Sequence, residues 1–484
     1  MPDIIREVPI ALFTETPLTE HGGEIWQLAP FGADRRPACG KFHLTCDPLA
    51  SLKNQKGDFL NWMGNQNETN AKQFRDQLAE IGQSILAGDL ADMLQLGKET
   101  SAKPPDRLLI RVLMYTDEEA GCLPVEAIYR GFNKKKALLG GGPLGFLGIN
   151  QARNISIVHQ LGLEPLASVE LKKAEPLRML VVFSNPNDAQ TKLGQVTKNG
   201  KLLTFDGALQ NERDALEAAL GELCRLDLLK IDFLVGDGDR LTGTVYAGEV
   251  CSLADQPNLA WKINKDELTG EKASLAHELV TKLKPQNREA SAPYHILHWF
   301  GHGVETGAGS GLCTTPGDEL TPAMLNFTPT PPITVLAGCH TAVPYGREAG
   351  QPVRGFASVL LSRGTAVLVA MQTYVTPETA TATTKAVYKA LVSDLFSDPL
   401  AIEWALLDLR RDLFTTNKLD FFVPRLYVRS VAGPLFDYAD DRRAIWKSIT
   451  TRGLPRSPFK LRKILQWTKT MLAGLSQNKS GSSV

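Results

Sequence analysis

Two stretches decide the fold, YHILHWFGHG at residues 294–303 and ITVLAGCH at residues 333–340. Each is an apolar, β-prone run that breaks at a glycine, and a histidine or a cysteine follows that glycine. In an open parallel sheet the carboxyl ends of neighbouring strands lie at one edge, where ligands and chemistry collect. The two stretches therefore predict an open parallel sheet that brings His302 and Cys339 together.

A cysteine and a histidine at such an edge have the elements of a nucleophile and its general base. Cysteine attacks only as a thiolate, and it needs partial exposure, a base and donors for the developing oxyanion. The sequence offers Cys339 as nucleophile, His302 as base, and the backbone N–H groups of Gly303 and Cys339 as donors. The alternative is a structural role for Cys339 as a buried, inert thiol, which is how most unpaired cysteines behave.

Two other histidines compete for the role of base. His340 adjoins the cysteine, but adjacent side chains in extended chain point to opposite faces, so we expect it to point away from the sulfur. His298 lies four residues before His302, which is roughly 13 Å along a strand, and we expect it to be a hydrogen-bonded core residue. No aspartate is placed as a third member, so a dyad is predicted.

The bulk composition excludes several classes of protein. Lys+Arg and Asp+Glu both number 53, so no overall charge favours nucleic acid or a membrane surface. No apolar run reaches the roughly 18 residues that a spanning helix needs, and the N-terminus does not resemble a secretory signal. Seven scattered cysteines suit reduced thiols better than a disulfide framework. We expect a soluble cytoplasmic protein without a nucleic-acid partner.

Strand-like and helix-like segments alternate along the chain, and this pattern predicts an α/β protein with a parallel sheet covered on both faces. Residues 1–105 are expected to be irregular at first and then helical. The predicted strands are 108–114, 177–183, 230–235 and 366–371. The predicted helices are 74–86, 124–129, 210–225, 356–363, 378–396 and 400–414.

The two stretches resemble the CHAT peptidases, a caspase-like family of clan CD. In that family one apolar strand ends in His-Gly and a second ends near Ala-Cys or Gly-Cys. The segment PVEAIY at 124–129 resembles the family's PWELLY-type segment, with Val125 in place of tryptophan. Residues 177–183 and 355–367 are similar to the family's first catalytic strand and to the segment after its cysteine. Together the match covers roughly residues 75–435.

The resemblance implies a caspase-like α/β/α sandwich in which a degenerate caspase-like lobe precedes a catalytic lobe. We expect these lobes at residues 1–170 and 175–435. Residues 436–484 would then hold an amphipathic basic helix, near 460–475, and a disordered tail.

The resemblance also assigns roles to residues of this chain. His302 would be the general base, Cys339 the nucleophile, and the N–H groups of Gly303 and Cys339 the oxyanion donors. Relatives that cut after Arg or Lys often carry an acid two positions before the cysteine, where this chain has Ala337. A non-acidic P1 cleft is therefore expected, and the candidate substrate-binding residues are Asn185, Asp188, Ala337, Met371 and Gln372.

No metal or cofactor is predicted. The basic and glycine-rich block at 134–142 lacks the Gly-Lys-Ser/Thr ending of a phosphate loop. Asp237-Gly238-Asp239 lacks the spaced oxygen ligands of a calcium loop. Cys39, His43 and Cys46 could contribute to a zinc site, but no fourth ligand is evident nearby.

The sequence thus predicts a cysteine endopeptidase that cuts a dedicated protein, in the regulated proteolysis of bacterial antiviral defence or cell death. The target would be a gasdermin or another effector that is encoded nearby, and a protein or ligand would activate the enzyme in trans. Self-cleavage in the lid-like loops 305–310 or 343–353 is the other route to activity. Two alternatives remain open: a non-catalytic caspase-like scaffold, and a signalling module that binds a cyclic nucleotide in residues 1–170.

Overall fold

The structure is a computed structural model of the 484-residue chain. It describes residues 4–14, 23–29, 38–44, 76, 78–79, 82, 108–116, 125–127, 129–130, 145–149, 154–161, 163, 165–171, 175–185, 197–198, 201–202, 206–237, 240–246, 275–284, 294–306, 309–315, 318–342, 345–348, 351–393, 395–396, 400–416, 418–429, 431–438, 442–443 and 446.

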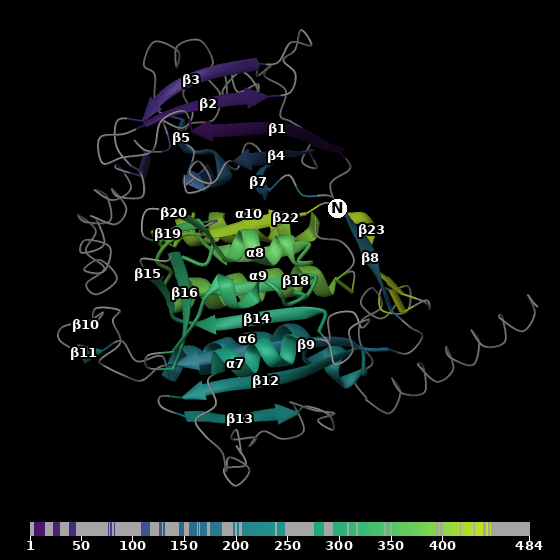
Figure 1. Cartoon of the computed structure of the whole chain (residues 1–484). Coiled ribbons are helices and arrows are strands. Elements are labelled where there is room, and N and C mark those ends of the chain that lie inside the picture. Colours follow the sequence, from purple (N-terminus) through teal and green to yellow (C-terminus); the bar gives the residue numbers. More distant parts are fainter. Residues whose placement is uncertain are drawn as a thin grey trace, which may run out of the picture.

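Among these residues a 12-stranded sheet forms the centre of the molecule, and Figure 1 shows it extending from β3 at the top to β13 at the bottom. In sheet order the strands are β13 (Arg240–Tyr246), β12 (Leu229–Asp237), β9 (Leu177–Asn185), β14 (Ile296–Gly301), β18 (Ile333–Ala337), β21 (Val367–Met371), β22 (Pro424–Val428), β7 (Asn154–Gln160), β4 (Leu108–Thr116), β1 (Ile4–Thr14), β2 (Gly23–Ala29) and β3 (Ala38–Leu44).

The sheet consists of two parallel blocks that run in opposite directions. Strands β12, β9, β14, β18 and β21 are parallel to one another. Strand β22 is antiparallel to β21 but parallel to β7, which continues parallel to β4 and β1. Strands β13, β2 and β3 add antiparallel edges. The two blocks therefore join where β21 pairs with β22.

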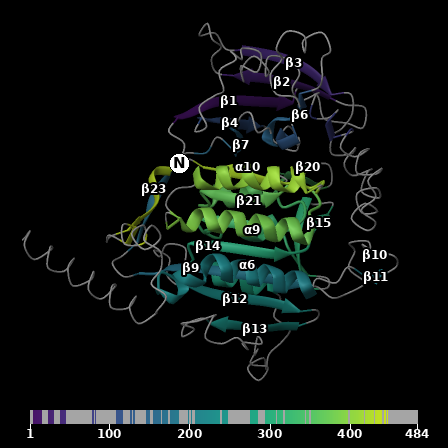
Figure 2. The same cartoon turned by 180° about the vertical axis from the view of Figure 1, so that it is seen from behind.

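Helices cover both faces of the larger block, because the apolar side chains of β9 point alternately to the two faces and are buried on both. Met179, Val181 and Phe183 belong to one buried cluster, whereas Leu180 and Val182 belong to the other, because successive strand side chains point to opposite faces. The first cluster packs against α6 (Asp206–Arg225), α9 (Pro377–Val392) and α10 (Leu400–Thr415), which Figure 2 shows side by side. The second packs against α7 (Leu275–Leu283) and α8 (Phe356–Ser362).

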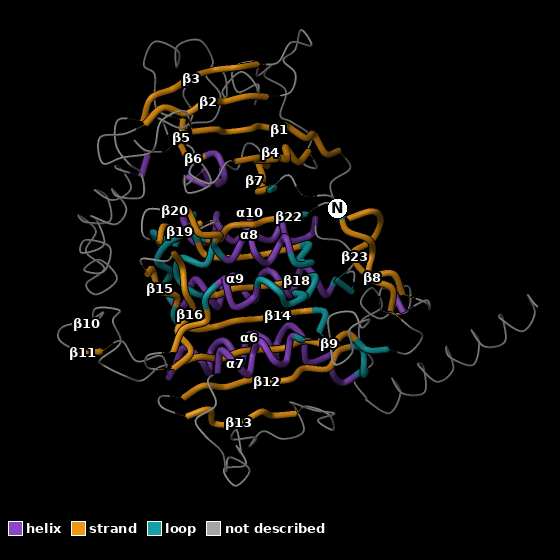
Figure 3. Tube along the Cα trace, viewed as in Figure 1, coloured by secondary structure: helices purple, strands orange, loops and turns teal. Residues whose placement is uncertain are grey.

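This arrangement confirms the predicted α/β sandwich, and Figure 3 shows the helices lying against the central strands. None of the helices that the structure describes is both long and apolar enough to cross a membrane.

Short elements complete the described part of the chain. They are the sheets β15 (Gly303–Thr306) with β16 (Gly309–Thr315) and β17 (Asp318–Leu320), β19 (Tyr345–Glu348) with β20 (Gln351–Arg354), β8 (Leu166–Leu171) with β23 (Val431–Tyr438), β5 (Tyr129–Arg130) with β6 (Gly145–Phe146), and β10 (Thr197–Lys198) with β11 (Lys201–Leu202), and the 3-10 helices η2 (Val125–Ala127), η3 (Leu147–Ile149) and η5 (Pro322–Leu325).

Several expected elements need correction. The first 44 residues were expected to be irregular, yet they contribute strands β1, β2 and β3. Pro9 lies inside β1, and a proline in a sequence makes a strand less expected there. In the structure β1 nevertheless pairs in parallel with β4 along nine residues. The expected helix at 124–129 is a single 3-10 turn. The segments expected as loops at 305–310 and 343–353 contain the hairpin strands β15, β16, β19 and β20.

Helix α9 was expected to continue to residue 396 but ends at Val392. Leu395 and Phe396 have positive φ angles of 47° and 61°, a left-handed conformation in which a right-handed helix cannot continue. Gly364, two residues after the end of α8, has φ 124°. The expected C-terminal helix at 460–475 lies outside the described residues. Strand β23 crosses the expected lobe boundary at residue 435, and the division into lobes stays a prediction.

Candidate active site

The two candidate residues follow neighbouring parallel strands at one edge of the sheet. In the register of β14 and β18, Phe300 lies opposite Ala337. Each of these residues is followed by a glycine and then by His302 or Cys339. Both strands are buried at every position, whereas His302 and Cys339 are partly exposed. Burial therefore ends at the same level on both strands, directly before His302 and Cys339.

The loops that carry these residues touch through their backbones. A Cβ atom placed on Gly303 would lie 1.8 Å from the carbonyl oxygen of Cys339 and 3.0 Å from its nitrogen. A Cβ placed on Gly338 would lie 3.0 Å from the oxygen of Gly301 and 3.5 Å from the nitrogen of Gly303. The structure thus brings His302 and Cys339 onto adjacent loops, and glycine is required at 303.

The loop of His302 is tied to its surroundings by the hairpin that follows. The N–H of Cys313 on β16 donates to the carbonyl oxygen of His302 at 3.0 Å. The hydroxyl of Ser184, near the end of β9, lies 2.6 Å from the carbonyl oxygen of Cys313 and 2.9 Å from that of Thr314. Gly301 packs on the same residue, since a Cβ there would lie 2.6 Å from the oxygen of Ser184. The position of His302 therefore depends on three strands.

The turn after Cys339 is held by the strand beside it. The hydroxyl of Thr341 lies 2.8 Å from the oxygen of Gly338, and it accepts the N–H of Met371 at 2.9 Å. The N–H of Ala342 donates to the oxygen of Met371 at 2.8 Å, and the N–H of His340 donates to that of Thr373 at 3.2 Å. His340 itself has φ 59°. The backbone is thus left-handed at His340, and the residues at the end of β21 support the turn.

His302 carries no charge at neutral pH. Burial lowers its pKa from 6.5 to about 4, because desolvation disfavours the imidazolium. A neutral imidazole can accept a proton from a thiol, which is what a general base requires. The sulfur of Cys339 lies 4.0 Å from the carbonyl oxygen of Val375, in the segment that leads into α9.

The two rival histidines take other roles. His298 is fully buried, with its Nε2 3.1 Å from a carboxylate oxygen of Glu212 and its Nδ1 3.2 Å from the hydroxyl of Tyr388. This confirms a hydrogen-bonded core histidine. The ring of His340 is buried and packs edge-on against Tyr374, with ring centroids 4.5 Å apart.

The expected substrate-binding residues do not all lie where a substrate could reach them. Asn185 is the last residue of β9, at the same edge of the sheet, and Asp188 lies outside the described residues. Ala337 is buried as the last residue of β18. Met371 is fully buried in the core, and the amide of Gln372 is occupied by Phe422, Glu126 and Arg425. Met371 and Gln372 are therefore corrected to structural positions.

Sequence reasoning missed the residues that support the two loops. Thr341 and Ser184 show no periodicity that sets them apart, because their hydroxyls bind backbone carbonyls that only the folded sheet brings near. The sequence did contain one indication, because Glu126 lies within a short apolar segment. A glutamate that such a segment buries needs a charged or hydrogen-bonding partner. The partners of Glu126 come from residues 159, 372 and 425 and cannot be read from spacing.

Metal sites were expected to be absent from this chain. Within the described residues, no three His, Cys, Asp or Glu side chains gather as metal ligands would. Asp237 lies on β12 and residues 39 and 43 lie on β3, while Asp239 and Cys46 fall outside the described residues.

Comparisons with known proteins give matches among solved structures. No protein-family model matches the chain, and no curated protein matches it. The chain is similar to Saccharomyces cerevisiae separase in its complex with securin, with TM-score 0.41 and 9% identity, over 89% of this chain and 30% of that chain. It is similar to the Arg-specific cysteine proteinase gingipain R, with TM-score 0.37 and 9% identity, over 79% of this chain and 76% of that chain. The chain thus spans less than a third of the separase chain.

Proposed function

We propose that the chain is a cysteine endopeptidase that uses a Cys339–His302 dyad. The observation that carries the proposal is the backbone contact between Gly303 and Cys339 at the carboxyl edge of β14 and β18. It holds the loop of the partly exposed Cys339 against the loop of the neutral His302, and the backbone nitrogens of Gly303 and Cys339 belong to those loops. A nucleophile, a base and oxyanion donors are the parts that acyl transfer needs.

The proposed reaction has two halves. His302 takes the thiol proton, and the sulfur of Cys339 attacks the peptide carbonyl carbon. The N–H groups of Gly303 and Cys339 stabilise the oxyanion. The tetrahedral intermediate then collapses to a thioester, and the amine leaves with the proton from His302. Water, deprotonated by His302, releases the acid and restores the thiol.

The substrate would bind across the same edge of the sheet. Asn185 ends the neighbouring strand β9, and Asp188 follows in sequence, so both are candidates for contacts with the substrate. Ala337 offers no charge two positions before the cysteine. We therefore propose a P1 preference for a residue that is not basic.

The likeness of the motifs to CHAT peptidases supports a finer proposal. The enzyme would act in the cytoplasm on a dedicated protein target, as part of regulated proteolysis in bacterial defence or cell death. A protein or ligand would activate it in trans, and the target would be encoded nearby. The hairpins β15–β16 and β19–β20, which follow the two candidate residues, would carry any self-cleavage site.

The test is cleavage of the proteins encoded beside this one. Wild type, Cys339→Ala and His302→Ala are each expressed with those proteins, and mass spectrometry identifies new fragments. We expect a fragment with wild type and none with either variant. Cys313→Ala is the matched control and should cleave normally, because burial raises the pKa of the Cys313 thiol to about 12 and leaves it protonated.

A non-catalytic scaffold or a nucleotide-binding signalling module would give the opposite result. If the fragments persist with Cys339→Ala, the Cys339–His302 dyad does not catalyse the cleavage. If no protein is cut and Cys339 also fails to react with a thiol-reactive peptide probe, the scaffold is the better description. Reaction of Cys339 with the probe without cleavage would mean a competent enzyme that lacks its activator.

A further inference from the structure

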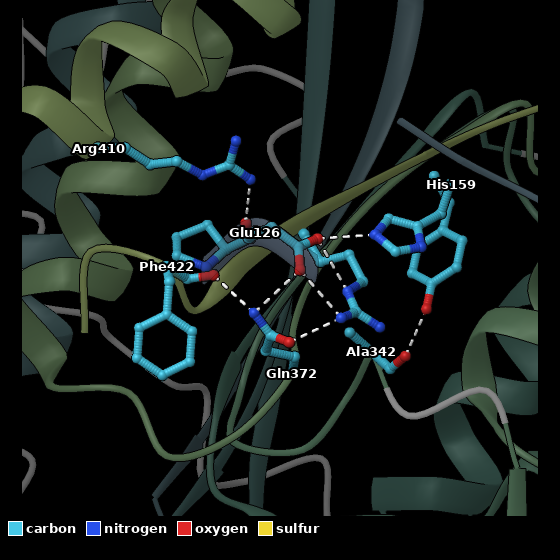
Figure 4. Close-up of polar contacts among 9 residues, drawn as sticks. Glu126, His159, Ala342, Gln372, Arg410 and Phe422 are labelled. Atoms are coloured by element: carbon cyan, nitrogen blue, oxygen red, sulfur yellow. Dashed lines mark hydrogen bonds and ion pairs between the residues drawn. The ribbon is translucent and has the colours of Figure 1, made fainter. Parts of the chain in front are cut away.

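A buried cluster of charged side chains lies where the two blocks of the sheet join. Figure 4 shows it around Glu126, which comes from η2 in the N-terminal part of the chain. Its partners come from β7, from β22 and from the residue after β21. Glu126, His159 and Arg425 are each 1% exposed and Gln372 is 5% exposed, so water does not solvate these charges.

Glu126 accepts hydrogen bonds from three side chains. The guanidinium of Arg425 binds both carboxylate oxygens at 3.0 Å, a bidentate arrangement. His159 Nε2 lies 2.7 Å from one oxygen, and the amide nitrogen of Gln372 lies 3.2 Å from the other. Arg425 in turn donates to the side-chain oxygen of Gln372 at 2.7 Å. The three partners thus depend on one carboxylate.

The carboxylate is charged and the histidine is neutral. Burial alone would raise the pKa of Glu126, but Arg425 and His159 outweigh it and hold the pKa of this carboxyl well below its usual range. Burial and the charge of Arg425 lower the pKa of His159 to about 4. Loss of either partner of such a buried pair leaves the other charge uncompensated.

Gln372 connects this cluster to the turn of Cys339. Its side chain is fixed by Glu126, by Arg425 and by the carbonyl oxygen of Phe422, to which it donates at 2.6 Å. Its two chain neighbours hold the turn: Met371 bonds to Thr341 and Ala342, and Thr373 bonds to His340. Any displacement of Gln372 therefore moves all three hydrogen bonds that support residues 340–342.

Tyr427 makes a second connection. Its hydroxyl donates to the carbonyl oxygen of Ala342 at 2.7 Å, and Figure 4 shows this bond beside His159. The rings of Tyr427 and His159 pack with centroids 5.0 Å apart. The histidine that binds Glu126 thus also supports the tyrosine that holds the turn.

We propose that Glu126 is a positioning residue for Cys339. It lies in the N-terminal part of the chain, whereas the turn that carries the thiol lies on the other block of the sheet. Glu126 fixes this turn by two connections, one through Gln372 and one through His159 and Tyr427. The proposal rests on the proposed function, because attack on a carbonyl carbon needs a thiol that its turn holds in one position. The N-terminal part is then a component of the active site without touching the substrate.

The first test is hydrogen exchange of the turn, read by mass spectrometry on overlapping peptides that cover residues 338–342 of the full chain. Glu126→Gln should speed exchange of the His340 and Ala342 amides about tenfold, the scale on which loss of a charge-assisted hydrogen bond acts. Glu403→Gln is the matched control, because Glu403 is also buried and binds an arginine across the joint, Arg111 at 2.7 Å, but does not contact the turn. It should leave that exchange within about twofold of wild type.

Two milder variants keep the test valid if Glu126→Gln does not fold. Gln372→Met keeps the pair of Glu126 and Arg425 and removes only the amide, and Tyr427→Phe removes only the hydroxyl on Ala342. Both should speed exchange in the turn. Tyr438→Phe loses an equivalent hydroxyl bond, to Leu395 at 2.7 Å, and should not. Exchange that stays at the wild-type rate in both Gln372→Met and Tyr427→Phe would overturn the proposal.

The second readout is the pH dependence of Cys339 alkylation by iodoacetamide, which a merely structural role would leave unchanged. We expect Glu126→Gln to change this pH dependence, because the turn no longer holds the thiol in one position next to the loop of His302. An unshifted profile in a folded variant would contradict the proposal. Exchange does not depend on chemistry, so it still decides the positioning if wild-type Cys339 proves unreactive and only the proposed function fails.

Discussion

Gly303 allows the loop of His302 to lie directly on the backbone of Cys339. We expect Gly303→Ala to lower the free energy of unfolding by at least about 2 kcal/mol, because its Cβ would lie 1.8 Å from a carbonyl oxygen and backbone cannot move aside as a side chain can. It should also abolish alkylation of Cys339. Gly221→Ala is the control, since its Cβ would meet nothing closer than 3.7 Å inside α6. It should stabilise the protein by about 0.5–1 kcal/mol in urea unfolding.

His302 determines the acid limit of the proposed activity. Its pKa is about 4 because of burial, so it stays neutral, and able to accept a proton, well below the ordinary histidine value of 6.5. We predict that the acid limb of kcat/KM has its midpoint near pH 4 and that most activity remains at pH 5.5. A midpoint near pH 6.5 would show that the general base is not the buried His302 with its lowered pKa.

His295 predicts how stability depends on pH. Its Nδ1 accepts the N–H of Arg178 at 2.9 Å, and burial lowers its pKa to about 4. The unfolded state therefore binds more protons between pH 6.5 and 4, so stability is full above pH 6.5 and is lost as the pH falls through this window, by up to about 3 kcal/mol. His295→Asn should flatten that slope by up to one proton in urea unfolding. His277→Asn, at an exposed position of α7, is the matched control.

At the scale of elements, the start of α9 lies close to the proposed nucleophile. Thr376 caps this helix: its hydroxyl accepts the N–H of Thr379 and donates to Asp420 at 2.7 Å. The preceding residue, Val375, lies beside the sulfur of Cys339. Thr376→Ala should cost about 1–2 kcal/mol in urea unfolding and slow alkylation of Cys339. Ser393→Ala, at the other end of α9, should cost less than about 0.5 kcal/mol. Equal effects would mean that the cap has no special link to the site.

Elements built from local sequence were predictable, and those built from distant pairing were not. Strands β9, β14, β18 and β21 are continuous apolar runs, and α10 has clear helical periodicity, so their sequences predicted them nearly to the residue. Strand β1 contains Pro9 and depends on a partner about a hundred residues away, β4, for its pairing. The placement of Cys339 and His302 followed from strand ends. The cluster of Glu126 could not be predicted, because its partners come from residues 159 to 425.

At the scale of the whole molecule, the two blocks of the sheet depend on each other. Gln372 follows β21, in the block of the proposed nucleophile, and Arg425 lies on the adjoining strand β22, but the carboxylate that both bind comes from residue 126. We predict that residues 175–446 expressed alone are less stable than the full chain by about 3–5 kcal/mol or fail to fold, because a buried guanidinium loses its partner. Co-expression with residues 1–170 should restore solubility and alkylation of Cys339. A stable, reactive 175–446 fragment would show that the blocks are independent.

We expect Cys339 and His302 to form one reactive pair. The test is the rate of iodoacetamide alkylation at Cys224, Cys313 and Cys339, followed by mass spectrometry at pH 7 in wild type and His302→Ala. Burial raises the pKa of Cys224 and of Cys313 to about 12, so both should stay unreactive. We expect Cys339 to react at least about tenfold faster than either, and His302→Ala to remove this advantage. Equal rates at the three thiols, or a Cys339 rate unchanged by His302→Ala, would contradict this expectation.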